Sequence, residues 1–301
     1  MDHLDCDRAG GSALGAQTMG LGGVVIPLRR RTAVHVSVIW LVFASSAWAH
    51  EPLFMASHEA PGKGAFDAHL EITGERTEAE DKTEYEVEAT WGLTRDVALQ
   101  VGLPMVVKSG EASESGGSLS ASGFGDPTVR LKWRFWDRPF RGGRYAAAAF
   151  FRTTVPVGEE GFGRDRPALL AGLAHGREGL KHYYFVDVRY AHAVADGGDR
   201  PGDALFLDAS YGLRPVRRGL EQTDVVFILE GNWEDRDRDR HENGVDTTSG
   251  GRFFSLALEA LVSPFNRLMI RGGVQVPVSQ NIPRGAPRRD LAFRLAVEFR
   301  L

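Results

Sequence analysis

The chain has 301 residues, a formal net charge of −4, 43 % apolar residues and a single cysteine, Cys6. This balance lacks the basic excess that a nucleic-acid partner requires, and one cysteine excludes a scaffold held by disulfides. The length suits a single barrel better than a typical soluble domain.

The first 49 residues have the pattern of a targeting region. Arg29, Arg30 and Arg31 precede the apolar run 34–43, and Ala47-Trp48-Ala49 follows with small residues at a cleavage position. That order is typical of a secretory signal peptide, whereas an uncleaved anchor needs about twenty apolar residues. We expect residues 29–49 to be the signal peptide, the mature chain to begin at His50, and residues 1–28 to be a misassigned start or a disordered extension.

Residues 50–64 contain two prolines and two glycines and predict an irregular periplasmic lead-in. From residue 65 onward, apolar and polar residues alternate with period two, which is the pattern of a strand with one apolar face. Segments of about ten such residues have the length that a tilted strand needs to cross a bilayer. The twelve predicted strands are 65–74, 83–93, 96–107, 125–136, 143–155, 167–177, 181–192, 203–215, 222–232, 251–263, 267–277 and 289–301.

The last predicted strand shows the pattern most clearly. Every odd residue from Leu291 to Leu301 is a large apolar residue, and every even one is alanine or charged. A soluble sandwich would bury the apolar face, whereas a membrane barrel would turn it toward lipid and keep the charges in the lumen.

The connections between the predicted strands separate these two folds. They alternate between short turns and longer polar loops, as an up-and-down barrel requires and a Greek-key sandwich does not. The sequence therefore predicts an all-β fold: one 12-stranded antiparallel transmembrane β-barrel over residues 65–301, in the outer membrane, with short periplasmic turns and long extracellular loops. A soluble exported β-protein is the alternative fold.

Aromatic residues gather on the apolar face near the short-turn ends of the strands. On an outer-membrane barrel such residues form a girdle at the lipid boundary. The predicted girdle consists of Phe66, Trp91, Phe135, Tyr145, Tyr184, Tyr211 and Phe299.

The stretch Gly123-Phe124-Gly125-Asp126, followed by an alternating strand that ends Lys132-Trp133-Arg134-Phe135, resembles a motif of a known family. This is the outer-membrane transporter family named for the phenol-degradation meta pathway. The segments 91–95, with Leu103-Pro104 in the next strand, and 154–158 are similar to further stretches of that family. The resemblance implies an outer-membrane barrel that acts as a channel or transporter.

Charged residues on the polar face are the candidate selectivity residues. Acidic residues crowd the first two predicted strands and basic residues the fourth and fifth, which predicts opposed walls with a field across the lumen. The alternative is a ladder of ion pairs that fills the lumen and only stabilises the barrel. The candidates are Glu84, Glu86, Glu88, Arg130, Lys132, Arg134, Arg152, Asp187, Arg189 and Arg271.

Other possible sites are less specific. His50 and His58 could offer imidazoles to a metal ion, but their spacing is common in solvated segments, so we predict no metal and no cofactor. Ser210 with His182 or His192 could suggest a hydrolase, yet no third group accompanies them, so we predict no enzyme. The loop 234–244 alternates in charge without the ligand pattern of a calcium loop.

The predicted function is passage of small polar or aromatic solutes through an outer-membrane channel. The expected partners are outer-membrane lipid and lipopolysaccharide, the barrel-assembly machinery and the solutes, with no nucleic acid. The alternatives are a filled barrel with a structural or surface-interaction role and an outer-membrane hydrolase.

Overall fold

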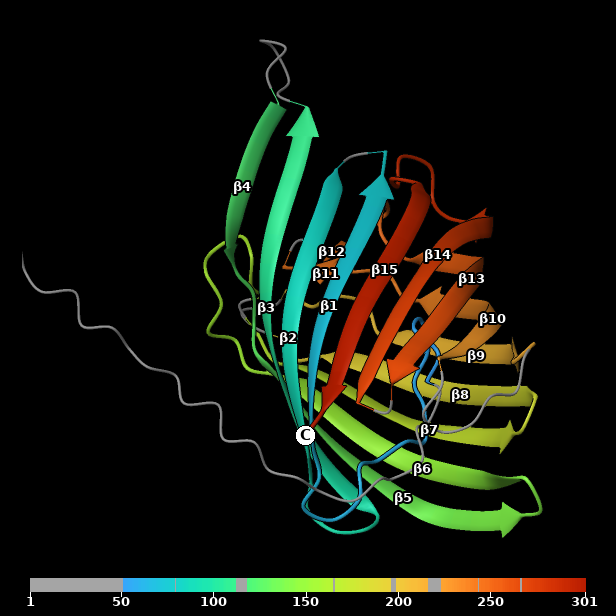
Figure 1. Ribbon diagram of the computed structural model, residues 1–301. Coiled ribbons are helices and arrows are strands. Elements are labelled where there is room, and N and C mark those ends of the chain that lie inside the picture. The colour runs from blue at the N-terminus through green and yellow to red at the C-terminus, as the bar shows by residue number, and fades with distance from the viewer. Residues whose placement is uncertain are drawn as a thin grey trace, which may run out of the picture. The chain divides into compact units, whose positions relative to one another are not determined.

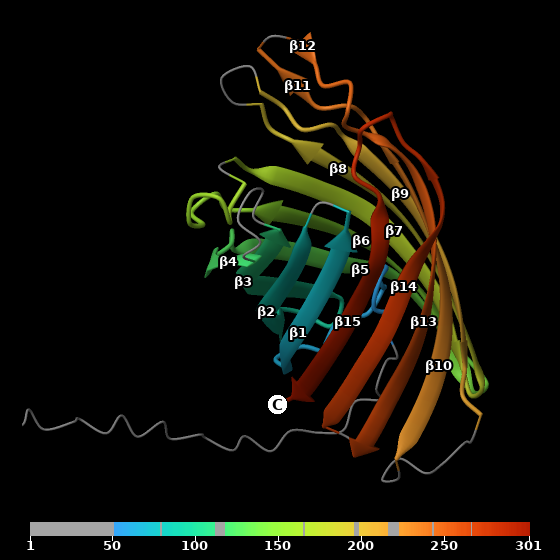
Figure 2. The same cartoon turned by 90° about the horizontal axis from the view of Figure 1, so that it is seen from above.

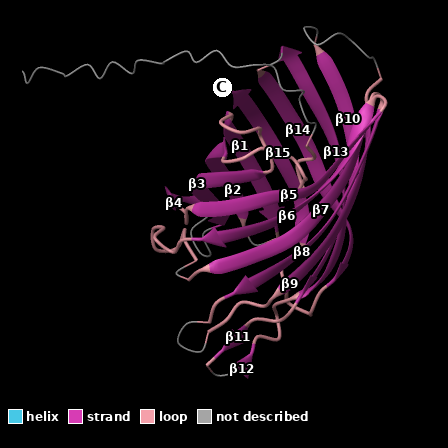
Figure 3. Ribbon diagram, turned by 90° about the horizontal axis from the view of Figure 1, so that it is seen from below, coloured by secondary structure: helices cyan, strands magenta, loops and turns pink. Residues whose placement is uncertain are grey.

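The computed structural model describes residues 51–78, 80–111, 118–164, 166–195, 199–215, 223–242, 244–265 and 267–301. The regular structure over these ranges is all strand (Figure 3). No helix in the described part of the chain is long and apolar enough to cross a membrane.

Alternating sequence forms strands because one face of each strand can be apolar while the other is polar. The first eight strands are β1 (Phe66–Thr77), β2 (Asp81–Gly92), β3 (Val97–Glu111), β4 (Ser118–Phe124), β5 (Thr128–Phe140), β6 (Gly143–Thr154), β7 (Ala168–Gly179) and β8 (His182–Ala193). The others are β9 (Ala204–Leu213), β10 (Asp224–Arg236), β11 (Arg240–His241), β12 (Gly244–Val245), β13 (Gly251–Phe265), β14 (Leu268–Asn281) and β15 (Arg289–Arg300).

These strands close into one antiparallel barrel (Figure 1). Thirteen described strands follow the order β2-β1-β15-β14-β13-β10-β9-β8-β7-β6-β5-β3-β4, and a further pairing of β2 with β3 completes the ring. β4 and β5 pair with successive parts of β3 and together fill one strand position in the ring. The barrel wall therefore has twelve strand positions, which we call staves. The predicted all-β, 12-stranded up-and-down fold is confirmed. The pair β11 and β12 forms a small separate hairpin.

The side chains alternate between the two faces of the wall as the sequence predicted. On the outer face Trp91 is 52 % exposed and Leu258 is 64 % exposed. On the inner face Glu230 is fully buried and Arg271 is 4 % exposed. Burial of charge together with exposure of large apolar side chains is the reverse of a soluble core and is the arrangement of an outer-membrane-type barrel.

The strands extend beyond the predicted boundaries at the long-loop end. The connection predicted at 75–82 shrinks to residues 78–80, because β1 and β2 continue to Thr77 and Asp81. Much of the loop predicted at 108–124 is strand, since β3 runs to Glu111 and β4 begins at Ser118. Beyond the lipid both faces of a strand can be polar, so apolar alternation no longer marks the strand.

The barrel closes where β1 meets β15. In this register Asp67 pairs with Arg300, and the Arg300 guanidinium donates to both Asp67 carboxylate oxygens, from Nε at 2.8 Å and from Nη2 at 3.1 Å. On the outer face Gly74 pairs with Phe293, whose ring covers the place where a side chain at Gly74 would lie. A bidentate ion pair inside and an aromatic ring outside therefore stabilise the same seam.

Candidate functional site

The chain just before β1 lies inside the barrel. The sequence predicted an irregular periplasmic lead-in, but residues 51–61 run along the inner wall, as the blue coil shows in Figures 1 and 2. Leu53, Phe54, Met55 and Ala60 are all at most 7 % exposed. We call residues 51–61 the plug segment.

Apolar contacts explain why the plug segment enters the lumen. Met55 packs into a buried cluster on the inner wall, and Leu53 and Phe54 pack beside Ala257 and Ala296. Three consecutive large apolar residues lose contact with water at these positions, which favours docking by the hydrophobic effect. The wall residues of the Met55 cluster are Tyr183, Phe185, Val226, Ile228, Leu261 and Met269.

Carboxylates of the wall accept hydrogen bonds from the plug backbone. The N–H of Leu53 donates to both carboxylate oxygens of Glu259 at 3.1 Å. Two further N–H groups donate to acids on other strands of the wall, Phe54 to Glu230 of β10 at 3.3 Å and Ala56 to Asp187 of β8 at 2.6 Å. An irregular segment cannot satisfy these donors by itself, so the wall satisfies them.

Basic side chains hold the plug carbonyls in the same way. Arg271 Nη1 donates to the carbonyl of Glu51 at 3.2 Å, and Arg294 Nη1 donates to the carbonyl of Leu53 at 2.6 Å. The alternation in the sequence places Arg271, Glu230, Glu259 and Arg294 on the lumen face, but only Arg271 was a selectivity candidate. Their role depends on where the plug lies, which strand alternation does not indicate.

The acidic candidates of β2 line the lumen in a row. Glu84 pairs with Lys82 at 2.9 Å near the long-loop end. Glu86 accepts from the Thr128 hydroxyl at 3.2 Å, and Glu88 lies 3.1 Å from Nδ1 of His69.

The basic candidates of β5 and β6 occupy different environments. Arg130 is in register with Arg152 of β6, so two cationic side chains lie side by side. Lys132 Nζ lies 3.7 Å from a Glu51 carboxylate oxygen of the plug. Arg134 is bound at the short-turn end, where it donates to Asp96 Oδ1 at 3.0 Å.

These acidic and basic rows are neighbours and not opposed walls. Only β3 separates β2 from β5, and the Glu86 to Thr128 hydrogen bond crosses it. Gly102 of β3 makes this contact possible, since an added Cβ would lie 2.1 Å from Glu86 Oε1. The predicted transverse field therefore becomes a mixed patch on one side of the lumen.

The other two wall candidates lie on β8. Asp187 accepts from the plug and also from Arg189 Nε at 3.0 Å, and Arg189 pairs in addition with Asp208 of β9. This side of the lumen therefore combines charge pairs with the apolar Met55 cluster.

A cavity of about 70 Å³ remains between the plug and the polar side of the wall. Its lining includes Glu51 and Glu59 of the plug, and Gln100, Arg130 and Lys132 of the wall. A space of this size holds a few water molecules. With the plug docked, this cavity has no room for an aromatic solute.

The seven predicted girdle residues lie on the outer face in the structure. Phe66 is in register with Trp91, and Tyr184 with Tyr211, whose ring centroids lie 5.2 Å apart. Arg177 contacts Tyr145 and Tyr184 by its guanidinium, at 5.8 and 5.7 Å from the ring centroids. Aromatic rings beside a cation suit the headgroup level of a membrane, so the girdle function remains our prediction.

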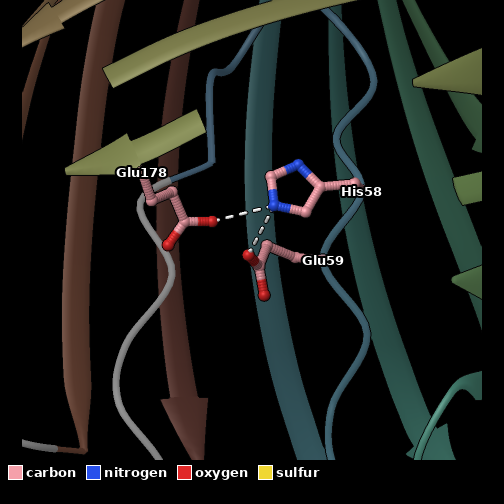
Figure 4. Close-up of side chains that lie close together, drawn as sticks. All are labelled: His58, Glu59 and Glu178. Atoms are coloured by element: carbon pink, nitrogen blue, oxygen red, sulfur yellow. Dashed lines mark ion pairs between the residues drawn. The ribbon is translucent and has the colours of Figure 1, made fainter. Parts of the chain in front are cut away.

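A second cluster joins the plug to β7 (Figure 4). Nε2 of His58 lies 2.9 Å from a Glu178 carboxylate oxygen and 3.2 Å from one of Glu59. Arg144 pairs with both of these carboxylates. Burial alone would lower the pKa of the His58 imidazole, but Glu178 and Glu59 raise it to about 9. His50, the other histidine considered for a metal, lies outside the described residues.

The residues considered for hydrolysis are not brought together. Ser210 faces the lumen, whereas His182 is exposed on the other face of the wall and hydrogen-bonds Tyr211 at 2.8 Å. His192 lies at the far end of β8 and contacts Asp203 at 3.0 Å. The charged loop 234–244 forms the end of β10 and the start of the β11–β12 hairpin.

The family model described as "Putative MetA-pathway of phenol degradation" matches residues 49–215. The fold is similar to that of an outer-membrane channel from Pseudomonas putida F1, with 11 % identity, 83 % of this chain and 100 % of that chain covered, and a TM-score of 0.63. The NanC porin also matches, with 9 % identity, 77 % and 100 % covered, and a TM-score of 0.49. The CymD monoaromatic hydrocarbon channel matches with 8 % identity, 79 % and 89 % covered, and a TM-score of 0.41. No curated protein matches the sequence.

Proposed function

The chain belongs to the phenol-degradation MetA-pathway family, and on that premise we propose that it is an outer-membrane channel for small polar or aromatic solutes. In this proposal the plug segment blocks the lumen and must leave before a solute can pass. Residues 29–49 direct export, and the mature barrel begins at His50 and meets lipid and lipopolysaccharide after insertion by the assembly machinery.

One observation carries the proposal: the wall binds a segment that is not one of its own strands, in addition to making its own charge pairs. Glu230, Glu259 and Asp187 accept hydrogen bonds from the plug backbone, and Arg271 and Arg294 donate to it. Water or a solute can replace such partners when the segment moves away.

The lining that the plug covers fits the proposed solutes. Removal of Met55 would uncover Tyr183, Phe185 and the aliphatic residues of that cluster, which can contact an aromatic ring. Glu86, Lys132 and Arg152 would supply the charged side of the passage. We propose these three, together with Glu84, Glu88, Arg130, Arg134, Asp187, Arg189 and Arg271, as the residues that set selectivity.

A filled barrel with a surface role is the second candidate. The burial of Leu53, Phe54 and Met55 and the small remaining cavity favour it. No described arrangement favours a hydrolase, since Ser210 and His182 lie on opposite faces.

Planar-bilayer conductance and liposome swelling test the two candidates. The channel proposal predicts small conductance for the intact mature chain, and larger steps with uptake of small aromatic solutes for a variant that lacks residues 51–61. Heat-modifiable mobility on a gel shows whether both proteins are folded. If the shortened barrel folds but stays silent, the filled barrel is the correct account.

A further inference from the structure

The cluster of His58, Glu59 and Glu178 has the composition of a metal site. One imidazole nitrogen and two carboxylates are donors that zinc accepts in proteins, and their ligand atoms all lie within 4.8 Å of one another. Nε2 of His58 is 2.9 and 3.2 Å from the two carboxylate oxygens, close to the ligand separations around a tetrahedral ion. Figure 4 shows both carboxylates directed at that nitrogen.

The imidazole is buried and held in place. His58 is fully buried, and among the described residues neither of its ring nitrogens has a hydrogen bond of good geometry. Its ring stacks on Phe185 at 5.6 Å between centroids, and Gly176 leaves the space that the ring fills, since an added Cβ would lie 2.4 Å from Cε1. Gly176 and Phe185 are in register on β7 and β8, so two staves fix the ring.

Arg144 completes the surroundings in the manner of a metal site. Its guanidinium pairs with Glu59 and with Glu178, as outer groups commonly bind ligating carboxylates. Two carboxylates and one guanidinium leave one negative charge before the imidazole is counted. This residual negative charge attracts a further cation, and a divalent ion bound with a neutral His58 leaves the cluster at a net charge of +1.

We propose that His58, Glu59 and Glu178 bind a divalent cation of the zinc class, which links the plug segment to β7. The ion takes one nitrogen and two carboxylate oxygens and leaves the fourth position to water. Because two ligands come from the plug and one from the wall, bound zinc opposes release of the plug. The binding itself does not depend on whether the barrel conducts solutes. A proton on Nε2 of His58 would occupy the same position and therefore competes with the metal ion.

Zinc titration of the folded mature chain in detergent tests the proposal. After treatment with a chelator and its removal, calorimetry at a fixed pH near neutral should show one zinc ion bound per chain. His58→Ala and Glu178→Gln should each weaken this binding more than about tenfold, and Gly176→Ala should weaken it without removing a ligand.

His175→Ala is the matched control, because His175 lies on the same strand but contacts Trp136 and Tyr145 on the outer face. It should keep the full stoichiometry. Heat-modifiable mobility shows whether each variant is folded, and X-ray absorption of the zinc-loaded wild type should show one nitrogen and two carboxylate ligands. Absence of stoichiometric uptake by the wild type, or uptake that persists in both ligand variants, would overturn the proposal and leave the proton as the occupant.

Discussion

The backbone N–H of Ala56 donates to Oδ2 of Asp187 at 2.6 Å, which joins the plug segment to β8. The acceptor is a carboxylate, so the hydrogen bond is charge-assisted and stronger than one between neutral groups. Plug and barrel wall are therefore coupled through a side chain that can be changed without altering the plug sequence.

Asp187→Ala should favour release of the plug. Loss of a hydrogen bond to a charged group costs about 1.5–3 kcal/mol, which raises the released fraction roughly 10- to 100-fold. Single-channel recording should show more frequent large openings than in the wild type. Asp199→Ala, which removes a carboxylate beside His241 near the β11–β12 hairpin, is the control and should not change them. Openings as rare in Asp187→Ala as in the wild type would contradict the coupling.

Lys132→Gln should shift ion selectivity toward cations. Lys132 lines the cavity beside the plug, so its charge acts on ions that cross the polar side of the lumen. The reversal potential in a salt gradient measures the shift. Lys181→Gln removes an exposed lysine from the short turn between β7 and β8 and should leave selectivity unchanged. Equal reversal potentials for both variants would remove Lys132 from the selectivity residues.

Asp67→Asn should weaken closure of the barrel. It breaks the bidentate pair with Arg300 at the seam of β1 and β15, where Asp67 is buried. We expect a loss of about 1.5–3 kcal/mol and a lower temperature at which the folded form loses its fast gel mobility. Asp81→Asn is the control, because it breaks a bidentate pair with Arg76 that is exposed to water. Exposed pairs contribute little, so a shift as large in Asp81→Asn would contradict this account.

Acid should loosen the plug through Glu51. Burial alone would raise the pKa of the Glu51 carboxyl, but Lys132, Arg271 and the Ser57 hydroxyl hold it below its ordinary value of 4.5. Its contribution to docking is therefore complete above pH 4.5 and is lost as the pH falls through the lowered value.

Thiol labelling of Ala60→Cys measures this effect, since Ala60 is buried only while the plug is docked and Cys6 precedes the expected mature start. Relative to a free thiol labelled at the same pH, which corrects for the loss of thiolate in acid, labelling should accelerate as the pH falls below 4.5. Glu51→Gln should label faster at neutral pH and show a smaller acid response. An unchanged pH profile in Glu51→Gln would show that other groups control release.

The barrel wall could be predicted from the sequence because lipid and lumen demand opposite side chains along every stave. Trp133 and Arg134 are adjacent in the sequence, yet one is exposed and the other buried, as alternation requires. The same rule placed the girdle residues on the outer face. It did not place the long-loop ends of β1 and β3, because the chain there is polar on both faces.

The plug and its partners could not be predicted in this way. Leu53, Phe54 and Met55 show that the segment is apolar, but no repeat indicates the surface that receives it. Glu230 and Glu259 look like ordinary lumen acids until the plug backbone is placed beside them. His58 and Glu178 lie 120 positions apart, so only the closed barrel brings them together. The predicted opposed walls were wrong because only one strand position of the twelve separates the acidic β2 from the basic β5, which puts both rows on the same side of the lumen.

The plug segment precedes β1 in the chain, but the groups that hold it lie largely on later strands: Asp187 on β8, Glu230 on β10, Glu259 on β13, Arg271 on β14 and Arg294 on β15. This imposes an order on biogenesis. The plug segment is translated before these strands but can make its contacts with them only after the C-terminal half has assembled. Docking of the plug therefore indicates a completed ring. During refolding, the cysteine of Ala60→Cys should become protected from thiol labelling together with the appearance of the fast-migrating form on the gel, or after it. Protection before that point would show that an incomplete ring can already hold the plug.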